Sequence, residues 1–117
     1  MTDVKASCLY PNAGRAMKEA AARGFDNAVV LDLNGNVAEF ANWNLFTVAD
    51  GVAHTPIPNG TFLNGITRQR VINLLRGRDV EVVERSMTPA DLVAPTKSSV
   101  PAITARSSRL SVTRTMI

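Results

Sequence analysis

The order of apolar and polar residues predicts two helices separated by a stretch of extended chain. Residues 13–23 are rich in Ala, Arg, Lys and Glu, and they lie between Asn12, a good N-cap, and Gly24, a typical helix stop. A second helix is predicted to begin near Thr67 and to end around Gly77. Its apolar stripe is formed by Val71, Ile72, Leu74 and Leu75.

The chain between these helices has the pattern of two β-hairpins. Residues 34–36 and 50–51 contain the turn-forming pairs Asn-Gly and Asp-Gly, each between short runs of β-branched and apolar residues. The pattern therefore predicts an antiparallel sheet in the middle of the chain. Its strands are expected over residues 27–32, 37–40, 44–49 and 52–55. A further strand over 80–84 and a helix that begins with Pro89 follow.

Composition places the chain among single-domain globular proteins. It has 117 residues, of which 45% are hydrophobic and 20% charged, a balance that supports a core. It has no apolar run of about eighteen residues, and its first residues lack the features of a signal peptide. We therefore expect a cytoplasmic protein without a membrane partner. Cys8 and His54 are each the only residue of their type, so they predict neither an intramolecular disulfide nor a clustered metal site.

The positive charge of the chain is confined to its end. The formal net charge is +3, yet residues 1–94 hold nine of the 13 Lys and Arg and all 10 Asp and Glu, a net charge of −1. Residues 95–117 hold four Lys or Arg and nine Ser or Thr, with no acid and no aromatic residue. Such a segment neither stacks bases nor buries much apolar surface, and no recognition fold precedes it. We expect no nucleic-acid partner.

Residues 63–68, Leu-Asn-Gly-Ile-Thr-Arg, form the most specific local feature of the chain. Gly65 allows close approach where a predicted helix begins, and the first N–H groups of a helix lack partners within it. The helix dipole favours an anion at this end, and the Thr67 hydroxyl adds a donor. The segment therefore suits a phosphorylated cofactor, although Thr67 equally suits an ordinary helix cap.

Several separated motifs together resemble the class IV aminotransferases, which use pyridoxal phosphate. Residues 39–46 (Glu-Phe-Ala-Asn-Trp-Asn-Leu-Phe), Thr55 and residues 63–68 follow the signature of that class in order and spacing. Within the class, residues 5–12 and 24–32 are most similar to the branched-chain amino acid aminotransferases.

Two positions depart from the pattern of this family. Ala53 stands where the signature usually has a larger aliphatic residue, and Trp43 stands where many members carry a carboxylate. The resemblance extends over residues 3–93. It implies an α+β fold, namely the C-terminal domain of the D-amino acid aminotransferase-like (class IV) fold that binds pyridoxal phosphate, in a truncated form.

The resemblance also implies roles for individual residues. Lys5 corresponds to the lysine that bonds covalently to the cofactor aldehyde and then shuttles a proton between the substrate α-carbon and the cofactor. Glu39 corresponds to the carboxylate that faces the pyridine nitrogen and makes the ring a better electron sink. The other cofactor-binding residues that it implies are Tyr10 at the phenolic oxygen, Leu63 on the ring, and Gly65, Ile66 and Thr67 at the phosphate.

The implied reaction is reversible amino transfer between leucine, isoleucine or valine and 2-oxoglutarate, so the expected partners are small amino acids and 2-oxo acids. The family also implies a homodimer or a higher homo-oligomer. Residues 63–68 alone do not separate this enzyme from a D-amino acid aminotransferase or an aminodeoxychorismate lyase. The alternatives from a different class are a non-catalytic remnant and a small binding protein with a basic tail.

The resemblance predicts a boundary near residue 94. Residues 1–94 correspond to part of the cofactor domain, whereas residues 95–117 do not resemble the strand and glycine-containing loop with which the family continues. Synonymous codons for residues 95–117 exist whose neighbouring reading frame encodes a sequence that resembles this continuation. We therefore expect residues 95–117 to be a disordered or a frameshifted tail, and the chain to be truncated at both ends.

Overall fold

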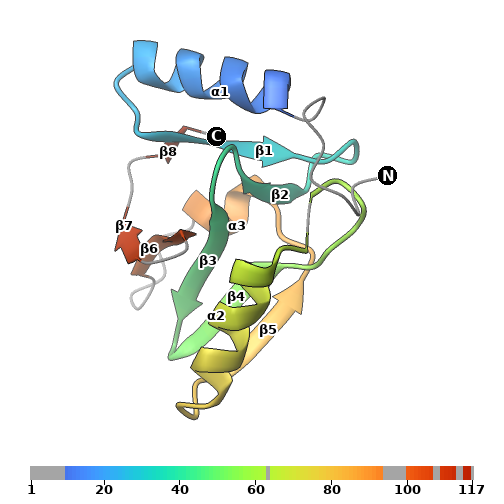
Figure 1. Ribbon diagram of the computed structural model, residues 1–117, viewed down its shortest axis with the longest axis vertical. Coiled ribbons are helices and arrows are strands. Elements are labelled where there is room, and N and C mark those ends of the chain that lie inside the picture. Colours follow the sequence, from blue (N-terminus) through green and yellow to red (C-terminus); the bar gives the residue numbers. More distant parts are fainter. Residues whose placement is uncertain (1–9, 63, 94–99, 107–108, 113–114, 117) are drawn as a thin grey trace.

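The computed structural model describes residues 10–62, 64–93, 100–106, 109–112 and 115–116 (Figure 1). Its helices are α1 (Tyr10–Ala22), α2 (Ile66–Arg76) and α3 (Pro89–Val93). Its strands are β1 (Asn27–Leu31), β2 (Val37–Phe40), β3 (Asn44–Ala49), β4 (Val52–Pro56), β5 (Val82–Arg85), β6 (Val100–Arg106), β7 (Arg109–Val112) and β8 (Thr115–Met116). The α+β fold expected from the sequence is confirmed.

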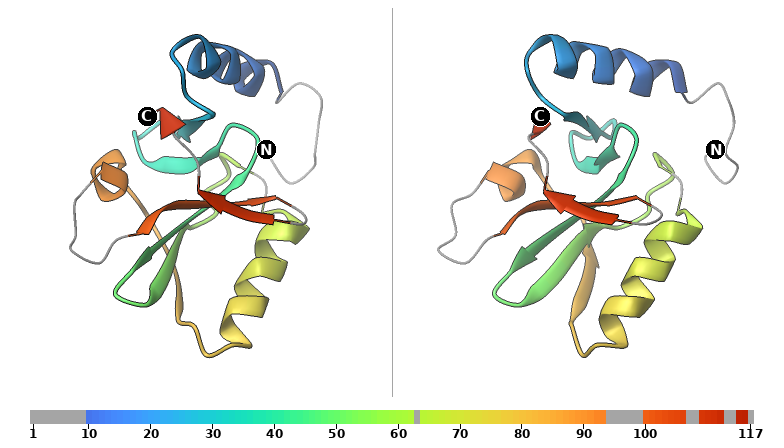
Figure 2. Two further views of the ribbon diagram at one scale, coloured as in Figure 1. Left: turned by 90° about the vertical axis from the view of Figure 1, so that its left-hand side faces the viewer. Right: turned by 60° about the vertical axis from the view of Figure 1, so that its left-hand side comes forward.

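The strands form two sheets, with the orders β2-β1-β8 and β5-β4-β3-β6-β7. Strand β1 pairs with β2 in an antiparallel manner, and β3 pairs with β4 in the same way. Strands β4 and β5 are parallel, so the chain crosses between them through helix α2, as parallel neighbours require. In Figures 1 and 2, α1 lies on the side of the smaller sheet and α2 beside the larger one.

Both predicted hairpins form, and their turns have the predicted chemistry. Asp50 and Gly51 have φ values of 52° and 81°, the two positive angles that a type I′ turn needs. The expectation of one antiparallel sheet is corrected, because the two hairpins belong to different sheets. The chain turns sharply between them, where the Phe40 N–H donates to the Trp43 carbonyl over 3.1 Å.

Helix α1 begins three residues earlier than the sequence predicts. Pro11 lies in its first turn, where a missing N–H costs no intrahelical hydrogen bond. Asn12 is therefore not an N-cap, and its side-chain oxygen accepts a hydrogen bond from Arg15. Among residues 11–22 of this helix only Ala20 is fully buried, so this part of α1 covers β1 with one narrow stripe.

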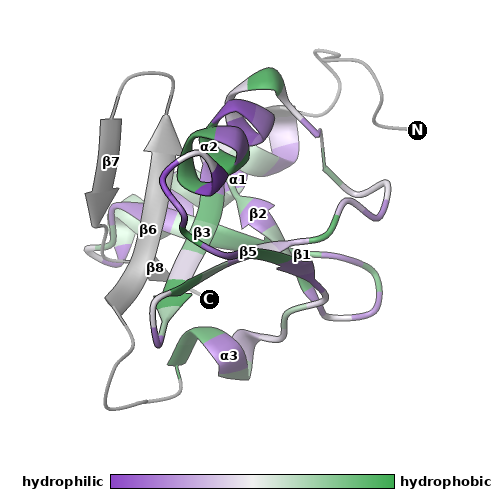
Figure 3. Cartoon of the chain, turned by 90° about the horizontal axis from the view of Figure 1, so that it is seen from below, coloured by the Kyte–Doolittle hydropathy of each residue, from purple (hydrophilic) through white to green (hydrophobic). Residues whose placement is uncertain are grey.

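Strand β3 lies between two hydrophobic clusters. On one face Phe46 joins Ala53, Ile72 and Val82, which attaches α2 to the larger sheet. On the other face Leu45 joins a second cluster, because consecutive residues of a strand point to opposite faces. This second cluster consists of Val37, Phe40, Leu45 and Met87. Figure 3 shows apolar and polar residues alternating around α2, whose apolar side belongs to the first cluster.

The last strands lie where the sequence indicates no regular structure. Strand β6 pairs with β3, and β7 extends the same sheet, while β8 pairs with β1. Without β6, strand β3 would present an unpaired edge, which favours pairing with any β-branched segment of the chain. Whether a frameshift produced this segment, and whether a boundary lies at residue 94, stay predictions. Within the described residues, no helix has the length and apolar character that crossing a membrane requires.

Candidate functional site

The loop that connects β4 to α2 carries most of the candidate site. It begins after Pro56, which is buried, and ends at Gly65, the N-cap of α2. On its way Asn59 donates from Nδ2 to Oδ2 of Asp32 over 2.7 Å, which attaches the loop to the turn between β1 and β2. The N-terminal end of α2 is accordingly the end nearer the smaller sheet (Figures 1 and 2).

The N-terminus of α2 has the properties of an anion site. Gly65 has φ −66° and ψ 156°, and within the described residues no side chain caps the helix. No acidic residue lies in the first turn, so nothing there neutralises the positive end of the helix dipole. Apart from the two neighbouring residues, no atom of the described chain lies within 4 Å of the place that a Cβ on Gly65 would take. The φ and ψ values of Gly65 are open to any residue, so its backbone conformation does not require glycine. The missing side chain instead leaves space beside these N–H groups.

The structure places three predicted phosphate-binding residues together at this helix end. Gly65 caps it, and Ile66 and Thr67 form the start of its first turn, so Thr67 is not the cap. The Thr67 side chain is half-buried. Ile66 is 86% exposed, which offers an apolar surface beside the polar N–H groups.

Glu39 occupies an unusual environment on β2, where it lies opposite Val30 of β1. Its side chain is half-buried, and burial raises the pKa of its carboxyl from 4.5 to about 7. No hydrogen bond or ion pair to it occurs within the described residues, and none links it to residues 65–67. A partly desolvated carboxylate without a partner is suited to accept a protonated nitrogen from a ligand.

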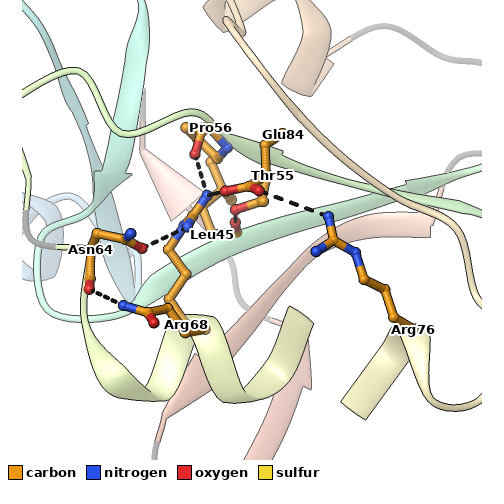
Figure 4. Close-up of polar contacts among 8 residues, drawn as sticks. Leu45, Thr55, Pro56, Asn64, Arg68, Arg76 and Glu84 are labelled. Carbon is orange, nitrogen blue, oxygen red and sulfur yellow. Dashed lines mark hydrogen bonds and ion pairs between the residues drawn. The ribbon is translucent and has the colours of Figure 1, made fainter. Parts of the chain in front are cut away.

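Arg68 is the strongest feature that the sequence analysis missed. Its side chain is only 2% exposed, and its guanidinium donates to three oxygens at 2.8 Å (Figure 4). Nη1 donates to Oδ1 of Asn64, and Nη2 donates to the Pro56 carbonyl and to Oε1 of Glu84. The guanidinium also lies over the Phe62 ring, 5.9 Å from its centroid. One side chain thus joins the loop, the end of β4 and strand β5.

A signal for this burial was present in the helical spacing. Arg68 precedes Ile72 by four residues and Leu75 by seven, so it belongs to the stripe that faces the sheet. Leu74, which the sequence analysis included in the stripe, is instead 57% exposed.

Trp43 stands where the inferred resemblance leads us to expect a carboxylate. Its side chain is half-buried and packs against the cluster of Val37, Phe40, Leu45 and Met87. Its Nε1 is buried and has no partner among the described residues. The position contributes apolar packing through the ring, whereas a buried indole N–H ordinarily has a hydrogen-bond partner.

Three predicted site residues lie outside what the structure describes. Lys5 and Leu63 are not among the described residues, and for Tyr10 only the backbone position at the start of α1 is given. Their assigned roles stay predictions. Among the described residues, no group of three or more His, Cys, Asp or Glu side chains could hold a metal ion.

The sequence profile of the amino-transferase class IV family matches residues 1–97. This match covers most of the chain, which therefore belongs to that family. The resemblance inferred from residues 39–46, Thr55 and residues 63–68 is confirmed.

Individual relatives agree with this assignment. A probable branched-chain-amino-acid aminotransferase from Aquifex aeolicus is 42% identical over 89 residues, which are 75% of this chain and 29% of the relative. An aminotransferase from Brucella abortus, solved bound to the cofactor PLP, superposes with a TM-score of 0.84 and 46% identity over 97% of this chain and 39% of its own. The branched-chain amino acid aminotransferase of Escherichia coli superposes with a TM-score of 0.86 and is 29% identical. The match covers 99% of this chain and 38% of that protein. The chain therefore spans about a third of the length of these proteins.

Proposed function

We propose that this chain carries the pyridoxal-phosphate site of a branched-chain aminotransferase. The whole protein would transfer an amino group between leucine, isoleucine or valine and 2-oxoglutarate. Relatives that are named for this activity and about 40% identical to the chain support the proposal. The chain's own contribution would be to bind and orient the cofactor.

The observation that carries the proposal is the N-terminus of α2, which no side chain of the described residues caps. Within the described residues its first N–H groups have no side-chain cap, its first turn has no acidic residue and space is open at Gly65, and these properties suit a phosphate group. The Thr67 hydroxyl lies in the same turn and can donate a further hydrogen bond. The residues present therefore fit the phosphate end of this cofactor.

Glu39 fits the opposite, nitrogen-containing end of the cofactor. Its carboxylate is half-buried and unpaired within the described residues, so a cationic nitrogen beside it would relieve the cost of its burial. When bound, pyridoxal phosphate supplies a ring that withdraws electrons from the α-carbon of an amino acid. Glu39 would hold the proton on the ring nitrogen and so keep that withdrawal strong.

Lys5 is proposed as the catalytic residue on the basis of the family motif. Its amine would hold the cofactor through a covalent bond and would move a proton at the substrate α-carbon. Tyr10 and Leu63 are proposed to contact the ring. Small amino acids and 2-oxo acids are the proposed partners, and a homodimer or higher homo-oligomer in the cytoplasm stays a prediction.

A labelling experiment tests the proposal directly. The chain has three lysines, Lys5, Lys18 and Lys97, so an adduct is easily located. Pyridoxal phosphate would be added, the product reduced with borohydride, and the labelled peptide identified by mass spectrometry. The variant Lys5→Ala should lose the label, whereas the matched control Lys18→Ala, on the exposed side of α1, should keep it.

The position of the label decides between the alternatives. A single adduct at Lys5 supports the cofactor site, and an assay with leucine and 2-oxoglutarate then measures whether the chain turns over. Label scattered over all lysines, or no label, would contradict the proposal and favour a non-catalytic remnant.

We propose further that residues 1–94 form the cofactor unit and that a frameshift produced residues 95–117. Sequencing the coding DNA tests this directly. A neighbouring frame that is open and encodes a class IV continuation supports it. Stop codons in that frame, together with an unambiguous present frame, would contradict it.

A further inference from the structure

Arg68 is the only charged side chain that is fully buried among the described residues. Its three acceptors come from three different places in the fold, and Figure 4 shows the guanidinium lying among them. Such a residue stabilises the fold. Its contacts also reach the loop that leads into the N-terminus of α2, where the phosphate is proposed to bind.

The guanidinium binds both ends of the loop between β4 and α2. Nη2 donates to the carbonyl of Pro56, where the loop begins, and Nη1 donates to the side chain of Asn64, directly before the N-cap. Phe62, inside the loop, is 5% exposed and lies beneath the same guanidinium. The start, the interior and the end of the loop are thus fixed to one planar group.

Asn64 is held from two sides. Its side-chain oxygen accepts from Arg68, and its main-chain carbonyl accepts from Nε2 of Gln69 over 2.8 Å. The Asn64 carbonyl belongs to the peptide whose N–H is that of Gly65. The orientation of this N–H is therefore coupled to the position of Arg68.

We propose that Arg68 is a positioning residue, which aims the first N–H groups of α2 at the phosphate by closing the loop between Pro56 and Asn64. This inference rests on the proposed function. The arrangement uses donors on two nitrogens of one planar group, which arginine provides, whereas the three donors of lysine all lie on a single nitrogen. Glu84 balances the buried charge from strand β5.

Amide hydrogen exchange of the ligand-free chain tests the positioning directly. The variant Arg68→Lys keeps the charge but replaces the two donor nitrogens Nη1 and Nη2 by a single nitrogen, so it does not reproduce the three hydrogen bonds. We expect amides of residues 57–67 to exchange about tenfold faster in this variant, which corresponds to about 1.4 kcal/mol for local opening. The control Arg76→Gln removes the other, half-exposed partner of Glu84 and should leave these amides unchanged.

A binding comparison tests the relation to phosphate. The affinities for pyridoxal phosphate and for pyridoxal, which lacks the phosphate, would be measured on each variant. Because the N–H groups act only on the phosphate, Arg68→Lys should reduce the preference for pyridoxal phosphate about tenfold and leave pyridoxal binding unchanged. A residue with a merely structural role would weaken both ligands equally. Glu84→Gln, which keeps the guanidinium, should show a smaller loss of the same kind, and it replaces Arg68→Lys if that variant unfolds.

The outcomes separate the two proposals. A wild-type chain that does not prefer pyridoxal phosphate contradicts the proposed function, and the inference falls with it. If the wild-type chain shows the preference and Arg68→Lys retains it, only the inference is overturned. Unchanged exchange in residues 57–67, or equal weakening of both ligands, also overturns it.

Discussion

Glu39 on β2 and Arg68 on α2 represent opposite ways of burying a charge. Arg68 is almost fully buried, and three oxygens at 2.8 Å surround its guanidinium. Glu39 is less buried, yet within the described residues it has no partner, and its pKa rises to about 7. The comparison teaches that a buried charge can be satisfied by oxygens of the chain itself, as at Arg68, or be left without a partner among the described residues, as at Glu39, where we propose that a ligand binds.

Removing the guanidinium should have the largest effect on stability. In Arg68→Met the Glu84 carboxylate, the Pro56 carbonyl and the Asn64 amide all lose a donor. We expect the free energy of unfolding to fall by about 3 kcal/mol, since three hydrogen bonds to a charged group are lost and the buried Pro56 carbonyl is left without this donor, although Glu84 is 32% exposed and stays partly hydrated. Urea unfolding followed by the fluorescence of Trp43, the single tryptophan, measures this. A loss below about 0.5 kcal/mol would show that the network behaves like a surface pair.

Removing the charge of Glu39 should stabilise the protein at pH values above the ordinary carboxyl pKa of 4.5. The folded pKa of about 7 lies above the ordinary 4.5, so the folded state binds more protons between these values and wild-type stability falls as pH rises through this range. Glu39→Gln should therefore match the wild type at pH 4.5 and exceed it by roughly 2 kcal/mol at pH 8. Urea unfolding at several pH values checks this, and parallel curves for the two proteins would contradict it.

The fold was predictable where local chemistry determines it. The Asp50-Gly51 pair specifies a type I′ turn, and both residues have the required positive φ. The pairing of strands in separate sheets was not predictable, because it depends on contacts between segments far apart in the sequence. Strand β1, for example, pairs with β8 near the end of the chain.

In the candidate site, too, the features that local sequence determines were predictable, and those that depend on distant segments were not. Residues 65–67 form one continuous segment, so the sequence could predict a helix start there, and the structure has one without a side-chain cap from the described residues. Arg68 directly follows, and its burial was missed because two of its partners, Pro56 and Glu84, lie 12 and 16 residues away. The unpaired state of Glu39 likewise depends on the packing of β2 rather than on local sequence.

A neutral buried donor should have a smaller effect than either charge. The Thr55 hydroxyl is buried and donates to the Leu45 carbonyl over 2.7 Å, between β4 and β3. Thr55→Val keeps the shape and removes the donor, so we expect a loss of about 1 kcal/mol that does not vary with pH. Thermal unfolding at pH 5 and pH 8 measures it. A pH-dependent difference would show that the charged groups respond to this hydrogen bond.

The second arginine at Glu84 should contribute least. Arg76 lies 3.8 Å from Oε2 of Glu84, and its side chain is 53% exposed. Water and salt screen such a pair, and ordering two long side chains opposes it. Arg76→Gln should therefore change the free energy of unfolding by less than about 0.5 kcal/mol in urea titrations at low and high salt. A larger loss would mean that Glu84 needs both arginines. The effect of Arg68 on the loop between β4 and α2 could then not be separated from that of Arg76.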